Sequence, residues 1–235
     1  MKQDAQRVSG LWRADVRVLV VSLGAIGAAV ALEGSGSNAY AMALGEASPV
    51  AATVAACLLG LLSLRILEAC GWFRSAGGTR RGYLVALLLG AVLPIPVLIV
   101  DILGGFSQGI NVSAPDAFLF YPAIAVVAEF VLHVAPLALV ALGATLVSKA
   151  DERARKLAMA LAVLPEPILQ MVWGAAYSPA WANAYVGIQL LVFGLLGLAL
   201  FRRHGFLAVY LYRLAYYAVW HIVWGYMRLG ILFGR

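Results

Sequence analysis

Seven long apolar runs constrain this chain more than any other feature of its sequence. A helix rises about 1.5 Å per residue, so about 20 apolar residues cross the hydrocarbon core of a bilayer. The runs lie near residues 16–32, 49–71, 83–103, 118–147, 157–177, 183–201 and 205–227. Because backbone polar groups must be satisfied within such a segment, the runs predict helices. We expect an all-α, polytopic transmembrane bundle of about seven spans that forms one integral-membrane domain over residues 1–235.

The composition supports a membrane protein and argues against a nucleic-acid partner. Hydrophobic residues make up 63% of the 235 residues and charged residues only 12%, whereas soluble domains average about 25% charged residues. The net charge of +6 comes from basic residues scattered between the apolar runs rather than gathered on one face. Such scatter is typical of topology signals and not of a nucleic-acid site, so the expected surroundings are lipid.

The basic residues predict the orientation. They occur before the first run and after the second, fourth and sixth runs, whereas the alternate loops "EGSGSNAYAMALGEASP", "GGFSQGINVSAPD" and "YSPAWAN" contain no Lys or Arg. Loops rich in Lys and Arg stay in the cytoplasm. We therefore expect a cytoplasmic N-terminus and an exterior C-terminus, in the cytoplasmic (inner) membrane of a bacterial-type cell.

Ionisable residues inside the runs are candidates for a functional site, because each is costly in lipid unless it is paired or wet. Arg65 and Glu68 lie three residues apart, so we expect a structural ion pair. Asp101 follows two prolines and is expected to cap freed amides or to border a cavity. Arg228 lies near the exterior end of the last run, where it is expected to act as an interfacial anchor.

The fourth, fifth and seventh runs carry polar residues at a spacing of four, which places them on one helix face. These residues are Glu129 and His133, then Glu166 and Gln170, then Arg213, Tyr217 and His221. Measured from the midpoint of each run, Glu129, Gln170 and His221 lie about 5–8 Å to the exterior side of the bilayer centre. The shared depth predicts one buried polar site built by three helices.

Such a site could hydrolyse a peptide bond. A buried carboxylate can act as the general base for water, while an imidazole and an amide can donate hydrogen bonds to an oxyanion. Glu129, His221 and Gln170 supply these groups. Zinc held by His133, His221 and a carboxylate is the weaker alternative because the sequence has no HExxH motif, so we expect no metal and no other cofactor.

The residues resemble the CAAX-protease and bacteriocin-processing (CPBP, or Abi) family of glutamic-type intramembrane proteases. Members carry the motifs EExxxR, FxxxH and HxxxN or HxxxD in this order. The chain reads Ala128-Glu129 and His133, then Glu166 to Gln170, then His221 to Gly225. His133 therefore replaces the arginine of the first motif, Gln170 replaces the histidine of the second, and Gly225 replaces the last Asn or Asp.

The resemblance covers about residues 118–230 and implies a function. It implies that Glu129 activates water and that His221 orients the substrate or the oxyanion, with Gln170 as a further donor. His133, Glu166, Arg213 and Tyr217 are expected to support the site or to bind substrate. The expected partner is a membrane-anchored peptide or protein substrate.

Two other classes of function stay open. The same polar residues could bind or transport a small ligand, lipid, quinone or proton without catalysis, or the chain could be a scaffold for another membrane protein. A protease needs Glu129, Gln170 and His221 within about 3–5 Å of a common point. The packing of these three side chains therefore separates the alternatives.

Overall fold

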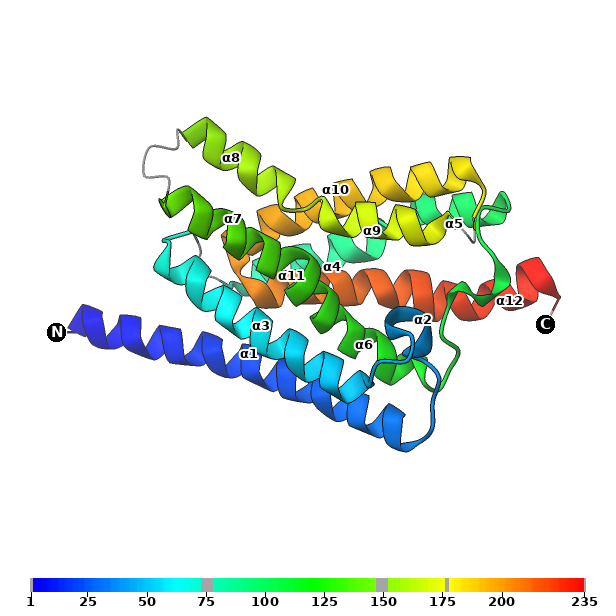
Figure 1. Ribbon diagram of the computed structural model, residues 1–235, viewed down its shortest axis with the longest axis horizontal. Helices are drawn as coiled ribbons and strands as arrows, with labels where there is room; N and C mark the ends of the chain where they lie inside the picture. Colours follow the sequence, from blue (N-terminus) through cyan, green and yellow to red (C-terminus); the bar gives the residue numbers. More distant parts are fainter. Residues whose placement is uncertain (1, 73–77, 147–151, 176–177, 235) are drawn as a thin grey trace.

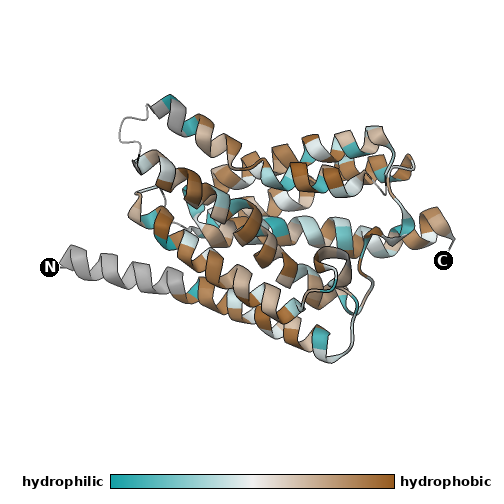
Figure 2. Cartoon of the chain, in the orientation of Figure 1, coloured by the Kyte–Doolittle hydropathy of each residue, from teal (hydrophilic) through white to brown (hydrophobic). Residues whose placement is uncertain are grey.

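The computed structural model describes residues 2–72, 78–146, 152–175 and 178–234, and regular structure in these ranges is helical. The predicted all-α bundle is confirmed, because seven helical segments are long and apolar enough to cross a membrane. Figure 2 shows hydrophobic residues along most of their length. The segments are Val16–Gly34, Pro49–Ala69, Arg80–Ile102, Ala117–Thr145, Lys156–Gly174, Ala180–His204 and Phe206–Phe233. They match the predicted runs closely, and the largest difference is that the last one reaches Phe233.

The elements follow one another in a simple order, with helices that are interrupted in several spans (Figure 1). They are α1 (Lys2–Gly34), α2 (Ala41–Leu44), α3 (Pro49–Ala69), α4 (Arg80–Val92), α5 (Ile95–Ile102), η1 (Gln108–Ile110), α6 (Ala117–Ala128), η2 (Glu129–Val134), α7 (Ala135–Leu146), α8 (Glu152–Leu161), α9 (Pro165–Gly174), α10 (Ala180–His204), α11 (Phe206–Tyr217), η3 (Ala218–Trp224) and α12 (Gly225–Phe233).

Prolines explain two of the interruptions. Pro94 separates α4 from α5, and Pro165 begins α9 after a short break behind α8. Proline has no amide hydrogen and its ring disturbs the preceding turn, so the helix bends there. The carbonyl of Leu93 at the first bend accepts a hydrogen bond of 2.8 Å from Nε2 of Gln189 on α10. The bend is thereby tied to a neighbouring span.

Two spans contain a segment of π-helix. In the fourth span η2 lies between α6 and α7, and in the seventh span η3 lies between α11 and α12. A π-helix is wider than an α-helix, and such segments are frequent at functional sites. The first holds Glu129 and His133, and the second holds His221. Both π-helical segments therefore carry polar residues that the sequence analysis had singled out.

Glycine allows close packing at the centre of the bundle. A side chain at Gly90 of α4 would meet the Tyr212 carbonyl of α11, and one at Gly60 of α3 would meet the Phe130 ring of η2. Small residues let membrane helices approach one another closely. The two chain ends lie at opposite ends of the bundle, as an odd number of crossings requires (Figure 1).

Candidate functional site

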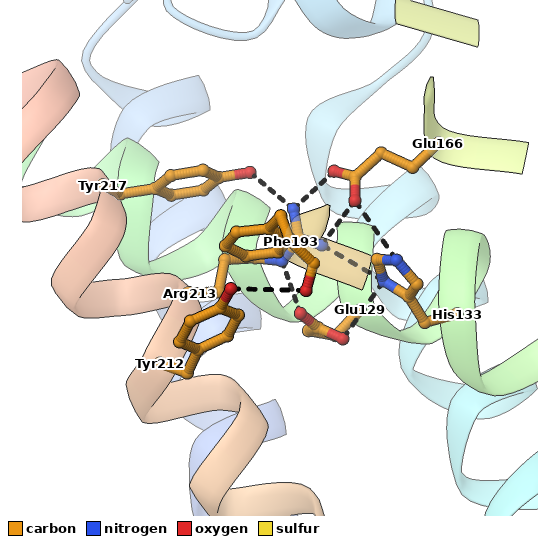
Figure 3. A network of polar contacts seen from close by, with 7 residues as sticks. All are labelled: Glu129, His133, Glu166, Phe193, Tyr212, Arg213 and Tyr217. Carbon is orange, nitrogen blue, oxygen red and sulfur yellow. Dashed lines mark hydrogen bonds and ion pairs between the residues drawn. The ribbon is translucent and has the colours of Figure 1, made fainter. Parts of the chain in front are cut away.

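Arg213 of α11 lies at the centre of a buried polar cluster. It is 1% exposed, and Figure 3 shows Glu129, Glu166 and Tyr217 pointing toward its guanidinium group. Its Nε donates to Oε1 of Glu129 at 2.5 Å. Its Nη1 and Nη2 donate to the two carboxylate oxygens of Glu166 at 2.6 and 2.8 Å. Carboxylates from η2 and α9 thus share one arginine, and the pair with Glu166 has the bidentate geometry that makes such pairs strong.

His133 bridges the two carboxylates. Its Nδ1 lies 3.3 Å from Oε2 of Glu129 and 3.1 Å from Nη2 of Arg213. Its Nε2 lies 3.2 Å from Oε2 of Glu166, but this buried nitrogen makes no hydrogen bond to the described residues. Nδ1 therefore has a hydrogen-bond partner in Arg213, whereas Nε2 lies beside the Glu166 carboxylate without a hydrogen bond among the described residues.

Aromatic rings enclose the arginine. Nη1 of Arg213 donates to the Tyr217 hydroxyl at 3.1 Å, and its Cζ lies 4.7 Å from the centre of the Phe193 ring. The Tyr212 ring stacks on Phe193 with 4.5 Å between the ring centres. Cations are attracted to the faces of aromatic rings, most strongly where water is excluded. We refer to Glu129, His133, Glu166, Arg213 and Tyr217 as the Arg213 cluster.

The charges of the Arg213 cluster do not balance. Five hydrogen bonds use all five N–H groups of Arg213, so the arginine has no further donor to offer. Two ionised carboxylates against one arginine leave a net charge of about −1 while His133 is neutral. An uncompensated charge in the low-dielectric interior is expensive. One additional proton, on His133 or on a carboxyl group, brings the cluster to neutrality.

A small cavity adjoins the cluster. It has a volume of about 20 Å³, and its lining includes Glu129, His133, Val163, Phe193 and Gly194. One water molecule needs about 10–15 Å³. A Cβ atom added at Gly194 would lie 3.4 Å from Nε2 of His133. The glycine therefore leaves space beside the nitrogen that lacks a partner.

Five of the seven site residues predicted from the sequence are brought together. Glu129, His133, Glu166, Arg213 and Tyr217 meet in one cluster. Polar residues of the fourth, fifth and seventh spans thus lie together, and the roles assigned to them stay predictions.

His221 does not join them, which corrects the expected packing of Glu129, Gln170 and His221. Its Nδ1 lies 2.6 Å from Oδ1 of Asn111, and its ring stacks on Tyr121 at 4.6 Å. Among the described residues neither His221 nor Gln170 forms a hydrogen bond or ion pair with Glu129. His221 lies eight residues, or about 12 Å of helix, beyond Arg213.

Depth does not explain the error. Glu129 lies about two residues from the midpoint of Ala117–Thr145 and His221 about two residues from that of Phe206–Phe233, so the two residues are at similar depth. A shared depth does not decide which neighbour a helix face meets, and His221 meets Asn111 and Tyr121 instead of Glu129. The long side chain of Arg213 also reaches Glu129 from a position nearer the start of the span.

Arg228 forms a second buried cluster, and its prediction as an exterior interfacial anchor is wrong. The residue is 0% exposed, and Asp101 is 1% exposed. Nε and Nη2 of Arg228 donate to the two oxygens of Asp101 at 2.6 and 2.7 Å, and Trp224 Nε1 donates to the same carboxylate at 2.6 Å. The remaining donors bind the carbonyls of Phe106, Ser107 and Gln108.

This Arg228 clamp ties the segment after α5 to the last span. It has one positive and one negative charge, and each N–H group of the arginine has an acceptor. The Asp101 carboxylate therefore accepts from Arg228 and Trp224 rather than from amides freed by the prolines. It is the counterion of a residue 127 positions away.

Two simpler expectations concern ion pairs and metals. Arg65 and Glu68 form the predicted ion pair at 3.0 Å. In the part of the chain that the structure describes, no group of three or more His, Cys, Asp and Glu side chains is arranged to hold a metal ion.

Sequence reasoning missed Phe193, Gly194 and Asn111. Phe193 and Gly194 lie on α10, whose run has no ionisable residue to mark it as part of a site. Its glycines at 187, 194 and 197 were the available signal, because small residues mark close helix contacts. Asn111 lies in a loop, and only its contact with His221 reveals it.

Comparison with known proteins identifies no relative. No protein-family model matches the chain, and neither the curated proteins nor the solved structures give a match. The resemblance to the CPBP family therefore rests on the short motifs alone, and the geometry of the clusters is the basis for a functional proposal.

Proposed function

We propose that this integral membrane protein takes up and releases one proton at the Arg213 cluster, and that this step controls the binding or passage of a small ligand. The observation that carries the proposal is the charge imbalance. Two carboxylates, each at most 3% exposed, share a single arginine whose donors are all used. A buried site of this kind is most stable when it holds one further positive charge.

His133 is the group through which the proton would enter. Its side chain is 14% exposed, whereas those of Glu129 and Glu166 are 1% and 3% exposed. It also lines the water-sized cavity and contacts both carboxylates. An imidazole can accept a proton on one nitrogen and pass one on from the other. The geometry supports a relay from the cavity to the carboxylates.

Glu129→Gln tests the proposal with little change of shape. The amide oxygen can still accept from Nε of Arg213, and the amide NH₂ takes the place of the carboxylate oxygen beside His133. The variant removes the excess negative charge, so we expect its proton uptake to be lost. Infrared titration of the carboxyl and imidazole bands in nanodiscs measures this directly.

A matched control separates this result from a general effect of losing a carboxylate. Glu68→Gln makes the same chemical change in a residue paired with Arg65 outside the cluster. The control should titrate like the wild type. A buried titration that persists in Glu129→Gln, or one that is missing from the wild type, contradicts the proposal.

Intramembrane proteolysis of the glutamic type is the second candidate. It is favoured by one observation, that Glu129 and His133 line a cavity large enough for a water molecule. Against it, Glu129 is already bound by Arg213, and neither Gln170 nor His221 is paired with it among the described residues. A membrane-anchored protein would be the substrate, in a bacterial-type inner membrane with the N-terminus in the cytoplasm.

Processing in cells distinguishes the two candidates. A candidate membrane-anchored substrate is co-expressed with the wild type, Glu129→Gln or His221→Ala, and folded protein is quantified for each. Loss of cleavage in folded Glu129→Gln together with normal cleavage in Glu68→Gln would favour proteolysis. Equal maturation of a dependent substrate in all variants would leave proton binding as the role of the cluster.

A further inference from the structure

A second cavity lies at the end of the bundle where α1 begins, about 280 Å³ in volume. Its polar lining consists of Arg17, Arg65, Glu68, Tyr83 and His204. These residues come from α1, α3, α4 and α10. One water molecule needs about 10–15 Å³, so this space is large enough for a small polar group and its hydration.

The cavity carries positive charge. Nη1 of Arg17 donates to the Tyr83 hydroxyl at 3.1 Å, and Arg65 pairs with Glu68 at 3.0 Å. Among the described residues that line the cavity, two arginines therefore accompany one carboxylate. Around the same end of the bundle stand four further exposed arginines, at the start of α4 and the end of α10: Arg80, Arg81, Arg202 and Arg203. This charge distribution favours an anion.

The rest of the lining is apolar and opens to the bilayer. Leu19 is 44% exposed and Leu62 is 60% exposed, and both line the cavity. Arg17 is the second residue of the span Val16–Gly34, and Arg65 lies four residues before the end of Pro49–Ala69. Arginines at such positions extend toward the head groups of the lipid. The arginines of the cavity thus lie where a phospholipid has its head group, and the leucines lie where it has its acyl chains.

We propose that this cavity binds an anionic phospholipid. Arg17 and Arg65 hold its phosphate group, and its acyl chains lie along Leu19 and Leu62. The distribution of basic residues predicts that this end faces the cytoplasm, where the leaflet carries anionic lipids. A soluble phosphate compound shares the head-group chemistry but has no apolar chain to cover the exposed leucines. A phospholipid therefore fits both the charged and the apolar parts of the cavity.

Lipid titration of the purified protein tests the proposal. Phosphatidylglycerol or phosphatidylcholine is added to the detergent-solubilised full chain, and the melting temperature and the bound lipid, by native mass spectrometry, are measured. We expect a selective response to phosphatidylglycerol. Arg17→Gln should lower its apparent affinity about fivefold, since one basic residue near an anionic lipid contributes about 1 kcal/mol.

Arg203→Gln is the matched control, because it removes the same charge at the same end of the bundle without lining the cavity. It should keep nearly the full response. Tyr83→Phe, a milder change, removes only the hydroxyl that holds Arg17 and should weaken binding less than Arg17→Gln does.

Three outcomes would overturn the proposal. The first is equal stabilisation by both lipids, and the second is equal loss in Arg17→Gln and Arg203→Gln. The third is stabilisation by inorganic phosphate alone that matches that of phosphatidylglycerol, which would assign the cavity to a soluble anion. Because Arg17 is exposed, its replacement leaves the core packing intact.

Discussion

The last span carries two buried arginines that differ in one decisive respect. Arg228 has one carboxylate and three backbone carbonyls, and its charge is balanced. Arg213 uses its donors just as fully, but its acceptors are two carboxylates, a histidine and the Tyr217 hydroxyl. A buried arginine is therefore not in itself the mark of a site. The excess carboxylate and the unsatisfied histidine nitrogen distinguish the Arg213 cluster.

The comparison suggests different roles for the two clusters. The Arg228 clamp fixes the segment after α5 against α12 and leaves nothing for a ligand or proton to satisfy. The Arg213 cluster joins η2, α9 and α11 and lies beside a water-sized cavity. We infer that the Arg228 clamp is structural and that the Arg213 cluster is the proposed site of proton uptake.

Arg213→Met should have the largest effect on stability. It leaves Glu129 and Glu166 buried without their arginine, and breaking a buried pair typically costs about 3–5 kcal/mol for one orphaned charge. We expect a loss of at least this size in the free energy of unfolding. The loss should shrink as the pH is lowered, because protonation of the carboxyl groups removes the buried charge.

Denaturation of Arg213→Met in detergent at several pH values measures this. Arg228→Met is the comparison: it orphans Asp101 alone, so its loss should be smaller and should also decrease in acid. Equal losses in the two variants would show that the second carboxylate of the Arg213 cluster carries no uncompensated charge.

Glu129→Gln and Asp101→Asn should have the next largest difference in their effect on stability. In the Arg213 cluster the amide oxygen keeps the contact to Nε of Arg213 and the substitution removes excess charge, so stability should change by less than about 1 kcal/mol. Asp101→Asn leaves the Arg228 charge without a counterion. It also places an NH₂ group against an N–H donor of Arg228. Its expected cost is about 3–5 kcal/mol.

Thermal unfolding of both variants in the same detergent provides the measurement. The two substitutions are chemically equivalent, so each serves as the control for the other. Similar losses would mean that both clusters are charge-balanced structural pairs, and the assignment of a proton to the Arg213 cluster would fail.

The sequence predicted the bundle well because the length of an apolar run is a local signal. It also identified Glu129, His133, Glu166, Arg213 and Tyr217, since each is costly in lipid and must find a partner. It could not assign the partners. Which carboxylate meets which arginine depends on helix offsets and on the π-helical segments, and these arise from packing between spans rather than from the pattern within one.

The error over Arg228 has the same origin. An arginine near the end of an apolar run can extend to the surface or turn inward, and the sequence near it is the same in both cases. The deciding residue is Asp101, 127 positions away, whose own run gives no sign of a partner. The sequence contains one signal for this pair: Asp101 and Arg228 are an anion and a cation that both lie in or next to apolar runs.

Gly194→Ala should have the smallest effect on stability and still sharpen the comparison. Its methyl group would enter the space beside Nε2 of His133 at 3.4 Å and would lie 3.0 Å from Cβ of Val163. A slight shift of Val163 accommodates it at a cost of about 1 kcal/mol. Gly143→Ala is the matched control, because a Cβ atom at this position meets nothing within 4 Å and the residue does not line the cavity. If the cavity delivers the proton through His133, uptake after a pH jump should slow in Gly194→Ala and stay normal in Gly143→Ala. Equal rates in both variants and the wild type would mean that the proton reaches the carboxylates by another route.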